Sequence, residues 1–121
     1  MIEPYLRFEI LKTQGVTIVR PFGTIRLTDG SMNIFQRRMR ELIVNQGNKN
    51  ILLDLGEIGH IDVSGIGELV SILRTAKNTG AVLKLYNLTR KIEDFLQIQR
   101  YRELFEVFDL ENKAIQSFRT S

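Results

Sequence analysis

The chain has no cysteine and only one histidine, His60. Without cysteine there is no disulfide, no thiolate metal ligand and no cysteine nucleophile, and the redox compartment stays undecided. One histidine excludes a multi-histidine metal site and leaves a single base for a triad with Ser64, which the predicted turn around His60 disfavours. A G-x-x-x-x-G-K-[ST] segment is also absent, which excludes a P-loop nucleotide enzyme. These absences exclude a cysteine nucleophile, thiolate and multi-histidine metal sites and a P-loop, and we expect no metal and no cofactor.

Long apolar runs and a strong charge of one sign are missing as well. The first residues, MIEPYLRFEI, lack the basic and then apolar regions of a secretory signal, and no apolar run approaches the roughly 18 residues that span a bilayer. The net charge is +3, with Lys and Arg spread among Asp and Glu. The basic run Arg37–Arg40 has no interleaved aromatic residues, so we interpret it as a solvated helix face. We expect a soluble cytoplasmic protein without membrane insertion or direct nucleic-acid binding.

The chain does have regular apolar patterns over most of its length. Its 121 residues and 43% hydrophobic content are sufficient for one domain with a real core. Tyr5–Leu11 and Val16–Phe22 are β-rich runs around a short turn, which predicts an antiparallel hairpin. Pro21 predicts an edge position or a strand end, because proline cannot donate to a ladder. A helical stripe then follows Ser31, the predicted N-cap, and ends at Gly47.

The stretch Asn50–Leu73 organises the rest of the chain. The apolar run Ile51–Leu55 predicts a strand buried on both faces. Gly56 and Gly59 predict a turn after this strand, and a helix then begins near Asp62. The apolar stripe of this helix consists of Ile66, Leu69, Val70, Leu73 and Ala76.

The start of this helix carries the most informative chemistry in the chain. Asp62 and Ser64 can each cap the unpaired N–H groups found there. Gly65 and Gly67 lie in the first turn, although glycine costs up to about 1 kcal/mol in a helix interior. Their presence indicates close approach by another backbone or by a partner. Two interpretations stay open: a capped helix with a structural role only, and an anion or phosphorylation site, because the same N–H groups stabilise a phosphate.

The C-terminal part alternates strands and helices. A strand at Val82–Leu85 follows the central helix, and the length of this crossover implies parallel pairing. A helix is expected after Thr89, a short strand at Leu104–Phe108, and a last helix capped by Asp109. The element order is therefore ββαβαβαβα. We predict an α/β fold with a mixed sheet covered by about four helices in a single layer.

Taken together, these features resemble the STAS domains, named for sulfate transporters and anti-sigma-factor antagonists. The similarity is to the free-standing bacterial antagonists, and it covers nearly the whole chain, so residues 1–121 are expected to form a single STAS domain. It rests on the element order, on ILLDL followed by IDVSGIGELV, on KNTGAVLKLYNLTRKIEDFLQI and on FEVFD. The D-x-S-G-I-G segment is fairly specific where a strand meets a helix.

The resemblance implies a function without catalysis. Such proteins bind an anti-sigma factor, typically an ATP-dependent serine kinase, and thereby free a sigma factor. The kinase phosphorylates a serine at the start of the helix after the third strand, and the phosphate weakens binding. In the usual motif this serine directly follows the aspartate, but here Val63 stands in its place, while Asp62 and Gly65 match. Ser64 matches the second hydroxyl position, which is usually not the acceptor.

Three alternatives follow from Val63. The protein is a constitutive antagonist, or it uses Ser64 as the phosphoacceptor, or it serves another assembly as a STAS subunit. That assembly is a lipid-transport ATPase or a stressosome-like complex, in which the chain acts as a protein-interaction or nucleotide-binding module. We favour the first and third, because a shift of one residue turns a helical side chain by about 100°.

The resemblance also indicates a surface for the partner, and a homodimer is a further expectation. The helix start is expected to face the partner, with polar residues that lie away from the apolar stripe beside it. The predicted partner-binding and phospho-switch region comprises Asp62, Val63, Ser64, Gly65, Gly67 and Glu68, with Ser71 and Arg74 flanking it.

Overall fold

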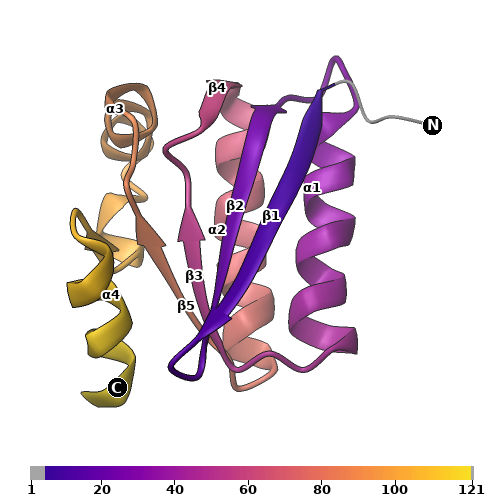
Figure 1. Cartoon of the computed structure of the whole chain (residues 1–121). Helices are drawn as coiled ribbons and strands as arrows, with labels where there is room; N and C mark the ends of the chain where they lie inside the picture. Colours follow the sequence, from indigo (N-terminus) through magenta and orange to yellow (C-terminus); the bar gives the residue numbers. More distant parts are fainter. Residues whose placement is uncertain (1–4, 121) are drawn as a thin grey trace.

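The computed structural model describes residues 5–120, and Figure 1 shows how its elements are arranged. The strands are β1 (Leu6–Thr13), β2 (Val16–Ile25), β3 (Asn50–Asp54), β4 (Ile58–Ile61), β5 (Val82–Tyr86) and β6 (Val107–Phe108). The α-helices are α1 (Ser31–Arg40), α2 (Val63–Asn78), α3 (Arg90–Ile98) and α4 (Glu111–Ser117). A π-helical segment extends α1, and two 3-10 turns lie near the C-terminus; these are Glu41–Asn45, Arg102–Leu104 and Phe118–Thr120.

The strands form one mixed sheet in the order β1-β2-β3-β5-β6, with β4 paired to β2 beside this path. β1 and β2 are antiparallel, as expected for a hairpin. The pairs β2–β3, β3–β5 and β5–β6 are parallel, because each connection crosses over through a helix. The predicted α/β class, mixed sheet and four helices are confirmed. The element order differs from the prediction by one additional strand, β4.

This additional strand explains an unexpected position of proline. β2 changes neighbour along its length: Thr17–Val19 pair with β3, and Gly23–Ile25 pair with β4. Pro21 lies between these two stretches, opposite Phe8 of β1. The edge or strand-end position predicted for Pro21 is therefore wrong. Proline is tolerated inside this strand because it occupies the step where β2 passes from one parallel neighbour to the other.

Helices cover both faces of the sheet. The larger hydrophobic cluster joins α1, α2 and α3 to Ile51 and Leu53 of β3. The smaller cluster joins Ala114 and Ile115 of α4 to Leu52 of the same strand. Since successive side chains of a strand point to opposite faces, β3 contributes to both clusters. The predicted single layer of helices is therefore wrong, because α4 packs on the face opposite to the other three (Figure 1).

Element boundaries follow local chemistry. α3 begins after Thr89, as predicted, and the hydroxyl of Thr89 accepts a hydrogen bond from Ile92 N at 3.2 Å. The predicted N-caps Ser31 and Asp109 are wrong by one residue: Gly30, with a φ of 79°, is the N-cap of α1, and Leu110 is the N-cap of α4. Of the strand predicted at Leu104–Phe108, only the last two residues pair with β5.

Candidate functional site

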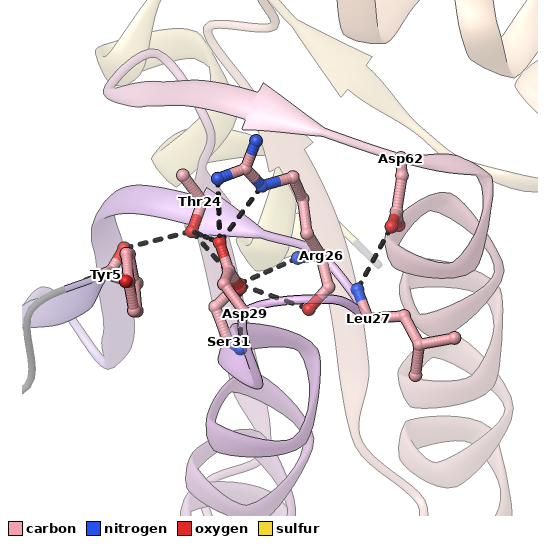
Figure 2. Close-up of polar contacts among 7 residues, drawn as sticks. All are labelled: Tyr5, Thr24, Arg26, Leu27, Asp29, Ser31 and Asp62. Atoms are coloured by element: carbon pink, nitrogen blue, oxygen red, sulfur yellow. Dashed lines mark hydrogen bonds and ion pairs between the residues drawn. The ribbon is translucent and has the colours of Figure 1, made fainter.

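α2 begins directly after β4, and Asp62 caps it. The backbone of Asp62 is extended, and its Oδ1 accepts a hydrogen bond from Gly65 N at 2.8 Å. Its Oδ2 accepts a second hydrogen bond from Leu27 N at 3.0 Å, which ties α2 to the loop between β2 and α1 (Figure 2). The predicted cap is confirmed, and both carboxylate oxygens of Asp62 are engaged within the protein.

The two glycines of the first turn have different surroundings. A Cβ on Gly65 would overlap the carbonyl oxygen of Ile25 and lie 2.7 Å from Cγ1 of Ile61. The close approach predicted for Gly65 is therefore made by the protein's own backbone. A Cβ on Gly67 would meet no atom of the described residues within 4 Å. Open space at Gly67 leaves room for another molecule.

Apolar side chains are exposed on both sides of Asp62. Val63 is 56% exposed and Leu27 is 55% exposed. The hydrogen bond from Leu27 to Asp62 brings these two segments together. Ser64 is half-buried, and its hydroxyl forms no hydrogen bond with any of residues 5–120. The start of α2 thus presents exposed apolar groups and an unengaged hydroxyl at the positive end of the helix dipole.

Glu68 does not lie on the surface as predicted. It is only 8% exposed, and its Oε2 has no hydrogen-bond partner in the described part of the chain. Burial raises the pKa of Glu68, and a hydrogen bond with Ser71 and the charge of Arg40 only partly offset this. The predicted exposure is wrong because α1 packs against α2, with its last residue, Arg40, close enough for its charge to act on Glu68. Of the other flanking residues, Ser71 is half-buried and Arg74 is exposed.

A second polar cluster lies at the start of α1, and of its residues the sequence pattern indicated only Ser31. Asp29 accepts hydrogen bonds from Thr24 Oγ1 at 2.8 Å and from Arg26 Nε at 3.0 Å (Figure 2). Ser31 N donates to Asp29 at 2.9 Å, and the buried Ser31 hydroxyl accepts from Arg26 N at 2.8 Å. Burial by itself would raise the pKa of Asp29, but hydrogen bonds from the hydroxyl and N–H of Ser31, from Thr24 and from Arg26 outweigh it and hold that pKa below its usual range. In the sequence, the feature that could have indicated this cluster is the D-G-S segment at Asp29–Ser31, which has the same D-x-S spacing as the start of α2.

His60 is not in a turn but in β4, opposite Thr24 of β2, and its side chain is exposed. No hydrogen bond joins His60 to Ser64 within the described residues. Between residues 5 and 120, no group of three or more His, Asp or Glu side chains is arranged to hold a metal ion. No helix in the same range combines the length and the apolar character needed to cross a membrane.

Comparison with known proteins agrees with this architecture. Residues 7–114 match the family model described as STAS domain. A candidate anti-sigma factor antagonist from Thermotoga maritima is 23% identical over 104 residues, which cover 86% of this chain and 90% of that protein. The crystal structure of a candidate antagonist from the same organism has a TM-score of 0.82 and 21% identity, and covers 93% of this chain and 94% of that one. The anti-sigma factor antagonist SpoIIAA, in its unphosphorylated form, has a TM-score of 0.70 and 17% identity, and covers 95% and 100%. At these identities the solved structures show a common fold.

Proposed function

The chain belongs to the STAS domain family, and on that premise we propose that it is an anti-sigma-factor antagonist. In this role it binds an anti-sigma factor that is itself a serine kinase, and it thereby releases a sigma factor in the cytoplasm. It acts by binding the anti-sigma factor and catalyses no reaction. The similarity to candidate antagonists along most of the chain supports this function.

One observation carries the proposal: the exposed apolar surface around the capped start of α2. Val63 and Leu27 each expose more than half of their surface, at 56% and 55%. Asp62 holds the two segments together, so little conformational freedom is lost when a partner binds. Adjacent exposed apolar side chains are typical of a protein interface, and the open space at Gly67 admits a close-lying partner.

We further propose that phosphorylation does not switch this protein at the usual position of the family. Val63 stands at that position and has no hydroxyl. Because Val63 is 56% exposed, a kinase can reach the position, and side-chain chemistry alone prevents phosphate transfer. Ser64 is the alternative acceptor. A phosphate on Ser64 would bring about −1.5 to −2 charges to an apolar surface and weaken binding.

An affinity pull-down from the native host tests both proposals. The bait is incubated with ATP and Mg²⁺ and its intact mass is then measured. We expect a serine-kinase anti-sigma factor to be recovered and the bait mass to stay unchanged. A phosphate on Ser64 would contradict the constitutive antagonist and restore a switch one residue along the helix. Recovery of a transporter ATPase, a stressosome-like complex or bound nucleotide, without a kinase, would favour the alternative assembly.

Matched valine variants locate the surface. Val63→Asp should reduce recovery of the kinase about tenfold or more, because it places a charge at the apolar contact. Val44→Asp makes the same change at a valine that is 43% exposed on the π-helical segment, and it should bind as the wild type does. Val63→Ser should be phosphorylated once, and recovery of the kinase with the phosphorylated variant should then fall. Equal losses for the two aspartate variants would contradict the proposed surface.

A further inference from the structure

A groove of about 590 Å³ lies between β1 and α1, which are neighbours in Figure 1. Its apolar lining comes from Leu6, Phe8 and Ile34. Phe8 and Ile34 are half-buried, so part of their apolar surface stays open. The groove shares no residue with the start of α2, and the proposed antagonist function does not use it.

The backbone beside this groove is available for pairing. β1 is an end strand of the sheet and pairs with β2 only, within the described residues. Phe8 lies opposite Pro21, which has no N–H, so these two residues cannot form a hydrogen-bonded pair. Backbone groups alternate between the two edges of a strand, and those of Leu6, Phe8 and Ile10 therefore turn toward the open edge. An extended peptide can hydrogen-bond there as an added strand.

The rim of the groove is basic. Arg7, Arg37 and Arg38 line it, and Glu41 is the one acid among its described lining residues. Glu41 is already engaged by Arg38 at 3.9 Å, and the Arg38 guanidinium lies over the ring of Phe8 at 6.0 Å. Arg37 is exposed, and no ion pair joins it to another of residues 5–120. A basic rim over an apolar floor complements a ligand that is both acidic and apolar.

We propose that this groove binds an acidic segment of another protein in an extended conformation, as a strand added to β1. The main chain of the segment pairs with the open edge beside Leu6 and Phe8. Its alternate apolar side chains enter the groove, and its acidic side chains face Arg37 and Arg38. A second copy of this chain is a poorer occupant, because pairing two β1 edges brings the same arginine-rich rims together and like charges repel.

Fluorescence anisotropy with labelled synthetic peptides tests the proposal on the full chain. The probe is a peptide of alternating Glu and Val, matched in length to the 8 residues of β1. One control peptide carries Lys in place of Glu, and another carries a central Pro, which cannot donate to a ladder. We expect the Glu peptide to bind with an affinity that falls as salt rises, and both controls to bind about tenfold more weakly or worse.

A matched pair of charge reversals locates the site. Arg37→Glu changes an exposed side chain that is ion-paired with none of the residues the structure describes, so folding should be unaffected while peptide binding weakens about tenfold. Lys113→Glu makes the same charge change at an exposed position of α4, on the other face of the sheet, and should bind as the wild type does. Amide shifts in NMR spectra should change along Leu6–Thr13 when the Glu peptide is added.

Several results would overturn the proposal. These are no binding of the Glu peptide at about 1 mM, equal binding of the Lys peptide, and equal losses in the two charge reversals. Shift changes confined to α2 would assign the peptide to the antagonist surface instead. A dimer in analytical ultracentrifugation that the Glu peptide does not dissociate, with β1 at its interface, would assign the groove to a second copy of the chain.

Discussion

The starts of α1 and α2 carry the same D-x-S pattern and use it in different ways. At α1, Ser31 is fully buried, and its hydroxyl accepts a hydrogen bond from the backbone of Arg26. At α2, Asp62 caps the helix, whereas the hydroxyl of Ser64 is not hydrogen-bonded within residues 5–120. The hydroxyl of Ser31 therefore stabilises the fold, whereas the hydroxyl of Ser64 can form a hydrogen bond with a second molecule.

The difference comes from what covers each helix start. Thr24 and Arg26 close over Asp29, so the polar groups at α1 satisfy one another (Figure 2). At α2 the neighbouring side chains are Val63 and Leu27, which are apolar and exposed. A closed polar cluster stabilises a loop, whereas a capped start with exposed apolar neighbours is suited to binding. Substitutions at the two helix starts test this difference.

The largest effect is expected at the close approach behind α2. Gly65→Ala places a methyl group against the carbonyl of Ile25 and the side chain of Ile61. The backbone cannot yield easily, so the free energy of unfolding should fall by about 3 kcal/mol. Gly67→Ala is the matched control, and its open surroundings predict a gain of up to about 1 kcal/mol from helix propensity. Urea unfolding followed by circular dichroism measures both, and equal losses would contradict the distinction.

The two serines should differ next in size of effect. Ser31→Ala removes a buried hydroxyl and leaves the N–H of Arg26 without its acceptor, which should cost about 2 kcal/mol. Ser64→Ala removes a hydroxyl that is hydrogen-bonded to none of the described residues, and it should change stability by less than about 0.5 kcal/mol. Thermal unfolding of the two variants side by side is the measurement. Similar losses would show that the two D-x-S segments are equivalent.

The cap of α2 should have an intermediate effect. Asp62→Ala loses the bonds to Gly65 N and Leu27 N, at a cost of roughly 0.5–2 kcal/mol. Recovery of the anti-sigma factor should fall as well, because Leu27 is no longer held beside Val63. Asp62→Asn keeps one acceptor oxygen and should lose less in both assays. Weaker binding with no change in melting temperature would mean that Asp62 contacts the partner directly.

The smallest effect concerns the buried carboxyl group one turn into α2. The pKa of Glu68 is raised above its ordinary value of 4.5, so the folded state holds this proton more tightly than the unfolded state. The free energy of unfolding should therefore fall as the pH rises from that value through the raised pKa. Glu68→Gln should remove this part of the slope of the free energy of unfolding against pH. It should also raise the free energy of unfolding by roughly 0.5–1 kcal/mol at neutral pH, because an amide costs less to bury than a carboxylate.

Urea titrations across this pH range measure the effect of Glu68→Gln. Glu103→Gln is the matched control, since Glu103 is exposed. The wild-type slope should persist in the control and diminish in the Glu68 variant. An unchanged slope in both would show that burial of Glu68 does not affect stability.

Local patterns were sufficient to predict the central unit of the fold. The apolar run at Ile51–Leu55 indicates a buried strand, and Asp62 and Thr89 indicate helix starts, because a strand run and an N-cap act within a few residues. The predicted apolar positions of α2 lie in the core for the same reason. The cap at Asp62 was predicted correctly, whereas Glu68 was predicted to be exposed and is buried; that this helix start binds a partner stays a prediction.

The features that the patterns missed depend on distant residues. Ile58–Ile61 is a strand because β2 extends far enough to pair with it, and Pro21 is tolerated where β2 changes neighbour. Glu68 is buried because α1 packs on it, and no spacing within α2 indicates that contact. The D-G-S segment at Asp29 forms a closed cluster only because the end of β2 brings Thr24 beside it.

Local sequence was sufficient to establish the class of fold, the order of its main elements, the cap of α2 and the absence of a hydroxyl at Val63. Packing between distant elements established which face α4 covers, which D-x-S segment is closed and which is open, and that a basic groove lies beside the edge of β1. The division has a physical reason. Propensity and capping depend on neighbours in the chain, whereas burial and exposure depend on which elements pack together across it.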